Sequence, residues 1–573
     1  MRRRRRRQHE ILPDEILLDG ENKPGFDTYQ LEGVIEQPIN RSTLLVLKLC
    51  FAVIFLIIAG KLFQLQVVSG QEMLTMSEQN RIRQVPIFSE RGIIYDRNDV
   101  ELAWNSKEDE EIPFSKRAYI EDGGFGHVLG YVGYPTKDNA GFYWRDEIVG
   151  RGGVEQILNP TLAGANGQQL VETDALLNIT DANTIVPPEH GANAHLSIDA
   201  RVQSALHQSI REHASEYGYQ GGVGVILNTD SGEVLTLTNY PEFSPSIMSE
   251  GDEEDMIASY FSSNQKPFLN RALSGLYTPG STVKPFVALA ALHEGKITED
   301  TAIMSTGQIE VPNPYNPEEP AIFRDWKDGG HGISDVKKAI GESVNTFFYA
   351  ISGGLDDIDG IGIRGIEKYI TAFGLGKESG IDLGSEVPGT IPTPEWKRQV
   401  FNGDSWRLGD TYITSIGQFG FQVTPLQMTR GVAALANSGK LVTPQVVSKR
   451  PSVSYIEEPI STHHYQVVRD GMRFTVTDGT AQSLNVPYID IAAKTGTAQV
   501  GKDNEFINSW VVGFFPYHDP RYAFALVMER GPNEEATRGA SWVLRNTMDQ
   551  LQENYPEFFA QFAPPEEIFV DQE

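Results

Sequence analysis

The sequence predicts an α+β protein whose main domain is a mixed β-sheet covered by helices. A single transmembrane helix and a small elongated domain are expected to precede this main domain. Three observations lead to the prediction. One long apolar run lies near the N-terminus, strand-like runs stand at both ends of the region after residue 190, and helical patterns lie between them. Strands and helices distributed in this way indicate one sheet that packs against helices.

The 573 residues divide into four predicted parts. They are a disordered tail, a transmembrane anchor, a small pedestal-like domain and the main domain, at residues 1–42, 43–66, 67–189 and 190–573. This division agrees with the number of domains that the length allows. The tail is polar and lacks an apolar helical period, which is typical of disorder. Within the pedestal, residues 128–132 read as a strand and the acidic residues 107–111 as a loop.

Residues 44–62 form an apolar run that only Lys48 and Lys61 interrupt. Because about 20 mainly apolar residues cross a bilayer, the run is long enough to span one. A buried core helix would be amphipathic, and a cleaved signal peptide would carry a small-residue cleavage site, so we favour an uncleaved signal anchor. Arg41 and the six arginines at positions 2–7 precede the run. This arrangement predicts a single-pass protein of the cell (inner) membrane, with a cytoplasmic N-terminus and an extracytoplasmic main domain.

The composition excludes several classes of function. The net charge of -29 disfavours a nucleic-acid partner. Binding of the arginine run to lipid or nucleic acid is the lesser alternative to a solvated tail. Cys50 is the only cysteine, which excludes an internal disulfide and a cysteine-rich metal site. The histidines do not cluster as metal ligands do, so we expect neither a metal nor another cofactor.

The main domain is expected to begin with a helix and a β-hairpin. Asp199 is a typical N-cap, and a helical pattern follows to about Tyr217. The next predicted elements are two strands joined by a turn at 230–232, then three strands near the C-terminus and a closing helix. Their expected residues are 222–227 and 234–238 for the hairpin, 491–494, 510–515 and 522–528 for the later strands, and 541–555 for the helix.

Ser281 and Lys284 stand at the predicted start of an apolar helix. Gly280 permits a tight turn, and the free N–H groups of a helix N-terminus favour a developing oxyanion. The i,i+3 spacing places the Lys284 amine on the same face as the Ser281 hydroxyl. Serine needs a neighbouring base to act as a nucleophile, and lysine serves when burial or a nearby cation lowers its pKa. For this tetrapeptide alone, a capping serine and a surface lysine remain the simpler interpretation.

A second pair of candidates is Ser343 and Asn345. The Ser343 hydroxyl is suited to relay a proton between Lys284 and a leaving amine. The Asn345 carboxamide is suited to hold a substrate backbone. This pair is also a weak signal by itself.

The third candidate element is Lys494, Thr495, Gly496 and Thr497, at the end of a predicted strand. Gly496 lets a substrate backbone approach the strand edge. Lys494 offers a positive charge, and the two threonines offer hydroxyl groups to a substrate carboxylate. The backbone N–H groups of Thr497 and Ser281 together are suited to form an oxyanion hole.

Together, and in this order, the three elements resemble the S-x-x-K, S-D-N and K-T-G motifs of penicillin-binding proteins and related β-lactamases. Four further segments resemble class B penicillin-binding proteins, and one of them resembles the elongation subclass, penicillin-binding protein 2. They are residues 91–98 and 150–155 in the pedestal, 270–277 before Ser281, and 325–332, which carry the elongation-subclass pattern. The resemblance covers about residues 44–555.

The chain departs from the family pattern at four positions. Asp99 and Phe419 stand where glycine is usual, Ala493 stands where glycine is common, and Asn345 stands where the elongation subclass often has Asp. None of these departures removes a catalytic group. The segment between Asn98 and Gly150 is short for the subclass, which puts partner docking in doubt more than catalysis.

Residues 121–127 resemble the glutamate motif of peptidoglycan glycosyltransferases. The spacing from Phe125 to His127 is one residue too short, and the region before the main domain is too small for a polymerising domain. We therefore expect a pedestal loop here and a partner that polymerises glycan.

The resemblance implies a peptidoglycan D,D-transpeptidase that binds penicillin and cross-links stem peptides during cell elongation. In such an enzyme Ser281, Lys284, Ser343 and Asn345 are catalytic, and residues 494–497 bind substrate. The implied ligands and partners are stem peptides, β-lactams, the membrane, a SEDS-type glycan polymerase and proteins of the elongation complex. The alternatives are a β-lactam-hydrolysing enzyme or carboxypeptidase, and a non-catalytic β-lactam sensor or scaffold.

Overall fold

The computed structural model describes residues 41–71, 82–107, 112–138, 143–173, 179–312, 316, 318–447, 452–457, 459–533 and 538–562. The chain divides into two compact units, Met1–Arg83 with Leu170–Asn183, and Gln84–Gln169 with Thr184–Glu573. The predicted disorder of residues 1–40 and the predicted loop at 108–111 lie outside the described residues.

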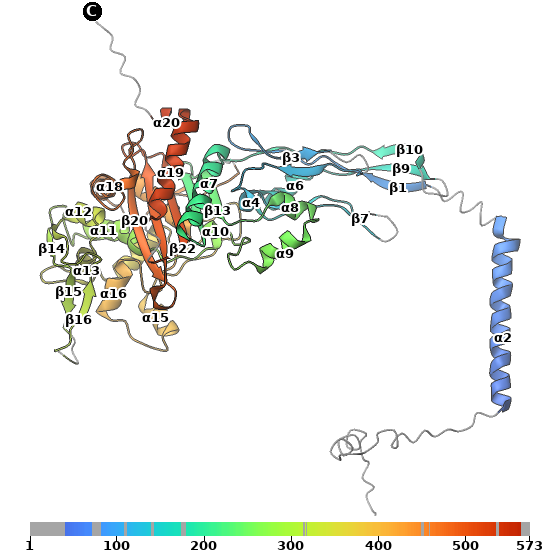
Figure 1. The fold of residues 1–573 in the computed structure, drawn as a ribbon, viewed down its shortest axis with the longest axis horizontal. Coiled ribbons are helices and arrows are strands. Elements are labelled where there is room, and N and C mark those ends of the chain that lie inside the picture. Colours follow the sequence, from blue (N-terminus) through green and yellow to red (C-terminus); the bar gives the residue numbers. More distant parts are fainter. Residues whose placement is uncertain are drawn as a thin grey trace, which may run out of the picture. The chain divides into compact units, whose positions relative to one another are not determined.

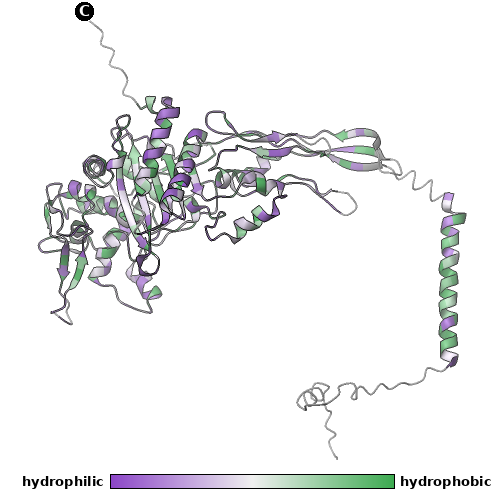
Figure 2. Cartoon of the chain, in the orientation of Figure 1, coloured by the Kyte–Doolittle hydropathy of each residue, from purple (hydrophilic) through white to green (hydrophobic). Residues whose placement is uncertain are grey.

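The first unit contains helix α2 (Arg41–Phe63), which continues into the π-helical turn η2 (Gln64–Val68). Within the described part of the chain, Arg41–Val68 is the one helix long and apolar enough to cross a membrane. Most residues of this helix are hydrophobic (Figure 2), and none of them is buried within the structure. The predicted single apolar helix is therefore present.

The pedestal region is built from small sheets and short helices. A three-stranded sheet has the order β1-β9-β10, and a four-stranded sheet has the order β11-β2-β3-β4. The strands are β1 (Ile82–Ile87), β2 (Ile94–Tyr95), β3 (Glu101–Ser106), β4 (Lys116–Tyr119), β9 (Gly167–Thr173), β10 (Ile179–Val186) and β11 (Ala194–His195). Two further pairs join β5 (Tyr131–Gly133) to β8 (Val149–Arg151) and β6 (Thr136–Lys137) to β7 (Tyr143–Arg145). The short helices are α4 (Gly126–Leu129), α5 (Gly153–Ile157) and α6 (Asn159–Leu162).

The predicted strand at residues 128–132 is wrong in its first half. Residues Gly126–Leu129 form helix α4, and strand β5 begins at Tyr131. The Glu242 carboxylate accepts hydrogen bonds from the backbone N–H groups of Gly124 and Gly126, which satisfies donors at the start of this helix. A short apolar run does not distinguish a buried strand from a buried helix, and this distant carboxylate favours the helix.

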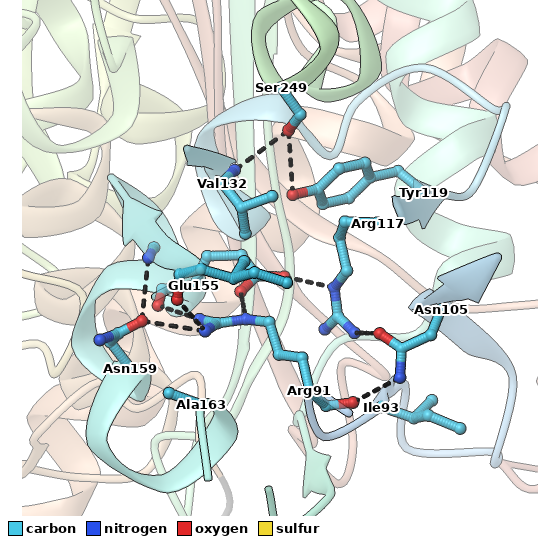
Figure 3. Close-up of polar contacts among 12 residues, drawn as sticks. Arg91, Ile93, Asn105, Arg117, Tyr119, Val132, Glu155, Asn159, Ala163 and Ser249 are labelled. Atoms are coloured by element: carbon cyan, nitrogen blue, oxygen red, sulfur yellow. Dashed lines mark hydrogen bonds and ion pairs between the residues drawn. The ribbon is translucent and has the colours of Figure 1, made fainter. Parts of the chain in front are cut away.

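A buried ion-pair network holds the pedestal together (Figure 3). Glu155 accepts hydrogen bonds from Arg91 Nε at 2.6 Å and from Arg117 Nε at 2.8 Å, and all three side chains are almost completely buried. Arg91 also donates to Asn159 Oδ1 at 2.9 Å, and Asn105 Nδ2 donates to the Arg91 carbonyl at 2.7 Å. These residues come from both pedestal segments that the sequence singled out. The buried ion pair between Arg91 and Glu155 therefore links segments 91–98 and 150–155 and gives both a structural role.

Asp96 joins the pedestal to the first helix of the main domain. One carboxylate oxygen accepts from the N–H groups of Asn98 and Val100, and the other accepts from the N–H of Ala200. Ala200 is the first residue of α7 (Ala200–Tyr217), where free N–H groups and the helix dipole favour a negative charge. The predicted N-cap, Asp199, accepts from the N–H of Arg201.

The main domain is centred on a five-stranded sheet with the order β13-β12-β22-β21-β20 (Figure 1). Its strands are β12 (Gly221–Asn228), β13 (Val234–Tyr240), β20 (Ala492–Val500), β21 (Phe506–Phe515) and β22 (Tyr522–Pro532). Every pairing in this sheet is antiparallel, so the predicted mixed sheet is corrected to an antiparallel one. Direct hairpins join β12 to β13, β20 to β21 and β21 to β22, and hairpins impose antiparallel pairing.

Helices cover both faces of this sheet. Helices α7 and α19 (Ala540–Asn554) pack on one face, and α17 (Pro425–Ala436) packs on the other. Along β12, Val225 and Leu227 belong to the core on one side while Ile226 belongs to the core on the other. This alternation is what a strand buried on both faces requires. The predicted hairpin, C-terminal strands and closing helix are confirmed.

The remaining elements of the main domain are mostly helices and short hairpins. The helices are α8 (Pro245–Glu250), α9 (Glu254–Ser262), α10 (Arg271–Ser274), η3 (Gly280–Val283), α11 (Lys284–His293), α12 (Val336–Gly341), α13 (Asn345–Gly353), α14 (Gly362–Ala372), α15 (Pro394–Val400), α16 (Leu408–Ser415), α18 (Thr462–Thr477), η4 (Gln482–Leu484), η5 (Lys502–Asn504) and α20 (Glu557–Ala560). The strand pairs are β14 (Ile303–Ser305) with β17 (Gly332–Ser334), β15 (Gln308–Val311) with β16 (Ala321–Arg324), and β18 (Lys440–Val442) with β19 (Val453–Tyr455).

The pedestal network predicts a large effect of one charge-removing substitution. Glu155→Gln keeps the size of the side chain but leaves Arg91 and Arg117 buried without a counter-charge. Loss of one partner of a buried ion pair costs about 3–5 kcal/mol, so we expect a clear fall in the melting temperature of the full chain in detergent. Glu147→Gln, at an exposed position, is the matched control. Equal melting temperatures for the two variants would contradict the structural role of the network.

Candidate functional site

Ser281 lies in a tight turn that the chain packs against the edge strand of the sheet. It belongs to the 3-10 turn η3, which leads into α11. Gly280 has a positive φ of 55°, and its N–H donates to the carbonyl of Gly417 at 3.0 Å. A Cβ at Gly496 on β20 would lie 2.8 Å from Thr282 Cγ2 and 2.9 Å from the Pro279 carbonyl. Glycines at these contacts therefore allow the turn and the strand to approach closely.

Lys284 is fully buried and connects two of the predicted motifs. Its Nζ donates to the Ser343 carbonyl at 2.8 Å, to Ser343 Oγ at 3.1 Å and to Asn345 Oδ1 at 2.6 Å. The amine also lies 5.2 Å from the centre of the Phe348 ring. Among the described residues no hydrogen bond joins Lys284 to Ser281, although Ser281 lines the same cleft as Ser343 and Asn345.

Ser343 occupies an unusual backbone position between two helices. Helix α12 ends at Gly341, α13 begins at Asn345, and Ser343 adopts a positive φ of 61°. Backbone hydrogen bonds from Ser343 and Val344 return to α12, at the carbonyls of Ile340 and Ala339. A non-glycine residue with positive φ is uncommon and is found at functional sites where the surroundings impose it. Here it presents both the carbonyl and the hydroxyl of Ser343 to one amine.

The Lys494–Thr497 segment forms the start of the edge strand β20. Thr495, Gly496 and Thr497, the predicted substrate-binding residues, line the cleft. Lys494 is completely buried, and its Nζ donates to the Thr495 carbonyl at 2.9 Å. Its charge therefore acts from beneath the cleft surface, and not as a group exposed to the ligand.

Burial and neighbouring charges set the pKa values of both lysines. Burial lowers the pKa of Lys494 to about 7. Burial also lowers the pKa of Lys284 well below its usual value, and the charge of Lys494 lowers it further. The Asp325 carboxylate acts in the opposite direction and raises the pKa of Lys284. A lysine whose neutral form is favoured in this way is suited to act as a base near neutral pH.

The cleft has a volume of about 730 Å³. Several residues that line it were not predicted as site residues, among them Asp325, Trp326, Gln418 and Thr480. Asp325 accepts hydrogen bonds from the N–H and the hydroxyl of Thr346, one residue after Asn345. Asp325 and Trp326 had been noted only as part of a subclass pattern, which was the signal available for them. Nothing near Thr480 resembles a motif, so only the fold identifies it.

The described residues contain no group of three or more His, Cys, Asp or Glu side chains that could hold a metal ion. The groups named so far at the site are hydroxyl, amide and lysine groups together with the buried Asp325.

Comparison with known families identifies both folded domains. The model of the penicillin-binding protein transpeptidase domain matches residues 222–549, and that of the penicillin-binding protein dimerisation domain matches residues 112–196. Because the first match covers more than half of the chain, the protein belongs to the penicillin-binding proteins, as a class B member with both domains. The glycosyltransferase-like segment 121–127 falls within the dimerisation match, as expected for a pedestal loop.

Curated relatives include the peptidoglycan D,D-transpeptidases MrdA of Acinetobacter baumannii and Escherichia coli. The first is 29% identical over 83% of this chain and 83% of the relative, and the second is 28% identical over 83% and 89%. Among solved structures, PBP2 of Helicobacter pylori in complex with MreC is 28% identical with a TM-score of 0.68, over 83% of this chain and 99% of that one. PBP2 of Pseudomonas aeruginosa is also 28% identical, with a TM-score of 0.67, over 84% and 100%.

The close approach at Gly496 predicts the effect of adding one methyl group. Gly496→Ala forces β20 away from the turn that carries Ser281, and small displacements of reacting groups slow catalysis strongly. We expect acylation by a fluorescent penicillin to slow at least about tenfold. Gly365→Ala is the control, because the three atoms nearest to the added Cβ there all belong to the Ile361 side chain and none to a backbone. Equal acylation rates for the two variants would contradict the packing role of Gly496.

Proposed function

We propose that this protein is a peptidoglycan D,D-transpeptidase in which Ser281 forms an acyl-enzyme with a stem peptide ending in D-Ala-D-Ala. The observation that carries the proposal is the buried Lys284 amine, which contacts Ser343 and Asn345 at a cleft that Ser281 and Thr497 also line. The MrdA relatives, of similar length, carry this activity in their names.

In the first half of the reaction, neutral Lys284 accepts the hydroxyl proton of Ser281, and Ser281 Oγ bonds to the carbonyl carbon of the penultimate D-alanine. The backbone N–H groups of Ser281 and Thr497 stabilise the oxyanion, and one such donor is worth about 3–4 kcal/mol. A Cβ placed on Gly280 would lie 3.7 Å from Thr497 N, so the two backbones are close enough to share one oxygen. The carbon–nitrogen bond then breaks, and Ser343 passes the proton from Lys284 to the departing D-alanine.

The second half of the reaction reverses these proton movements. An amine of another stem peptide attacks the acyl carbon, and its proton returns through Ser343 to Lys284. The bond to Ser281 Oγ breaks, and Ser281 regains a proton. Asn345 holds the donor backbone, while Thr495 and Thr497 hold the carboxylate of the leaving D-alanine. Lys494 supports that carboxylate and disfavours protonation of Lys284.

The membrane position and the partners form part of the same proposal. Helix α2 anchors the chain in the cell membrane, with the pedestal and the transpeptidase domain on the extracytoplasmic side. The similarity to a PBP2 solved with MreC supports partners of the elongation complex. No polymerising domain is expected in this chain, so we assign glycan polymerisation to a SEDS-type partner.

A lifetime measurement with a fluorescent penicillin tests this function. We expect the full chain to form a persistent covalent adduct and Ser281→Ala to form none, while Ser263→Ala, at another serine, retains it. Rapid loss of the label would indicate a β-lactamase. A stable adduct without any turnover of D-Ala-D-Ala peptides would indicate a sensor or scaffold. No adduct in the unaltered chain would contradict the whole proposal.

The pH dependence of acylation is expected to move in opposite directions in two variants. Acylation needs neutral Lys284, so its rate falls as the pH drops through the pKa of this group. Lys494→Met removes a cation that lowers this pKa, so the acidic limb should move to higher pH. Asp325→Asn removes an anion that raises it, so the limb should move to lower pH. Limbs that stay in place or move in the same direction would show that Lys284 is not the base.

A further inference from the structure

Arg324 and Trp326 are among the cleft residues that have no part in the mechanism above. Arg324 ends strand β16, Trp326 follows two residues later, and both line the cleft with Ser281. Trp326 is 58% exposed although it is a large apolar side chain. Its indole N–H donates to the carbonyl of Glu342 at 3.1 Å, and its ring lies 5.3 Å from that of His331. The indole is therefore held in place while much of its surface remains open.

Trp326 lies close in the fold to the residue that exchanges a proton with the acceptor amine. Its hydrogen-bond partner, Glu342, directly precedes Ser343 in the chain. Ser343 hands the proton to the departing amine, and microscopic reversibility requires the arriving amine to exchange its proton with the same group. Trp326 and Ser343 also line the same cleft, so the indole borders the space through which an acceptor amine reaches Ser343.

Arg324 supplies a positive charge at the same part of the cleft. Among the described residues that line the cleft it is the only cationic one, in a chain whose net charge is -29. The guanidinium donates to Gln308 Oε1 at 3.0 Å, and Gln308 is its cross-strand partner in the β15–β16 pair. The Tyr349 hydroxyl donates to the Arg324 carbonyl at 3.3 Å. One N–H group of the guanidinium makes the contact to Gln308, and its planar fork is suited to bind a carboxylate.

We propose that Arg324 and Trp326 form the subsite for the acceptor stem peptide, the strand that supplies the amine for the cross-link. The indole packs against the aliphatic part of the acceptor, and the guanidinium pairs with one of its carboxylates. A stem peptide that ends in D-Ala-D-Ala carries at least its C-terminal carboxylate, so every uncleaved acceptor offers such a group. This assignment rests on the proposed cross-linking function and deepens it.

The test compares a large acceptor with a small one on the same acyl-enzyme. The full chain in detergent receives uncross-linked glycan strands with pentapeptide stems, and cross-linked products are quantified by mass spectrometry. A parallel reaction adds an excess of a free D-amino acid, which exchanges with the terminal D-alanine. This small acceptor does not need contacts with Arg324 and Trp326. We expect Arg324→Gln and Trp326→Ala to lower cross-linking about tenfold while D-amino-acid exchange stays within about twofold. Trp326→Phe, which retains an aromatic face, is expected to recover most of the cross-linking.

Matched controls come from exposed residues outside the cleft. Trp144→Ala and Arg407→Gln remove an exposed tryptophan and an exposed arginine, and both should leave the two reactions unchanged. Equal losses of exchange and cross-linking in the Arg324 and Trp326 variants would overturn the subsite, because these residues would then act on the acyl-enzyme step that both reactions share. Unchanged cross-linking would overturn it as well. Absence of both reactions in the unaltered chain would instead contradict the proposed function.

Discussion

The Lys284 amine makes hydrogen bonds to the carbonyl and hydroxyl of Ser343 and to the carboxamide of Asn345, and these contacts unite the site. They join the first residue of α11 to the junction of α12 and α13, nearly sixty residues further along the chain. The positive φ of Ser343 is what turns both of its oxygens toward the amine. Once this junction is fixed, Ser281 on the preceding turn and Thr497 on the edge strand define the remaining sides of the cleft.

The buried charged residues of the pedestal and of the cleft differ in whether they have a counter-charge. In the pedestal, Glu155 lies between the guanidinium groups of Arg91 and Arg117, so each buried charge has a counter-charge at hydrogen-bond distance. At the cleft, Lys284 and Lys494 are buried, no carboxylate in the described part of the chain forms an ion pair with either amine, and burial lowers the pKa of both. Paired charges keep a region rigid and ionised, whereas unpaired buried amines favour the neutral form that a base needs. The first arrangement serves structure and the second serves chemistry.

The sequence predicted the residue types of the site but not all of their contacts. Ser281, Ser343, Asn345 and Thr497 were recognisable because the chemistry restricts which side chains can perform it. The interaction of Lys284 with Ser343 was predicted only as a relay, because its geometry depends on how α11 packs against α12 and α13. Asp325 and Thr480 were missed as site residues, since the fold brings them to the cleft from separate loops.

The sequence also predicted the local elements of the fold but not the contacts between distant segments. The hairpin β12–β13 and the C-terminal strands follow from local apolar patterns and turn residues. The pairing direction of strands that are distant in sequence, such as β12 and β22, is not encoded in such patterns, and this pair proved antiparallel. The short run at 128–132 is partly helical because Glu242, more than a hundred residues away, binds the N–H groups at its start. Contacts of this range lie outside what a local pattern contains.

The central claim is that the fold excludes water from Lys284 and thereby lowers its pKa, which favours the neutral amine that a base needs. The most direct measurement is the titration of its side-chain ¹³Cε signal in the lysine-labelled full chain, assigned by its loss in Lys284→Arg. The account predicts a midpoint well below the ordinary lysine value of 10.5. A midpoint at that ordinary value would contradict the account, because Lys284 would then be charged when the reaction requires a base.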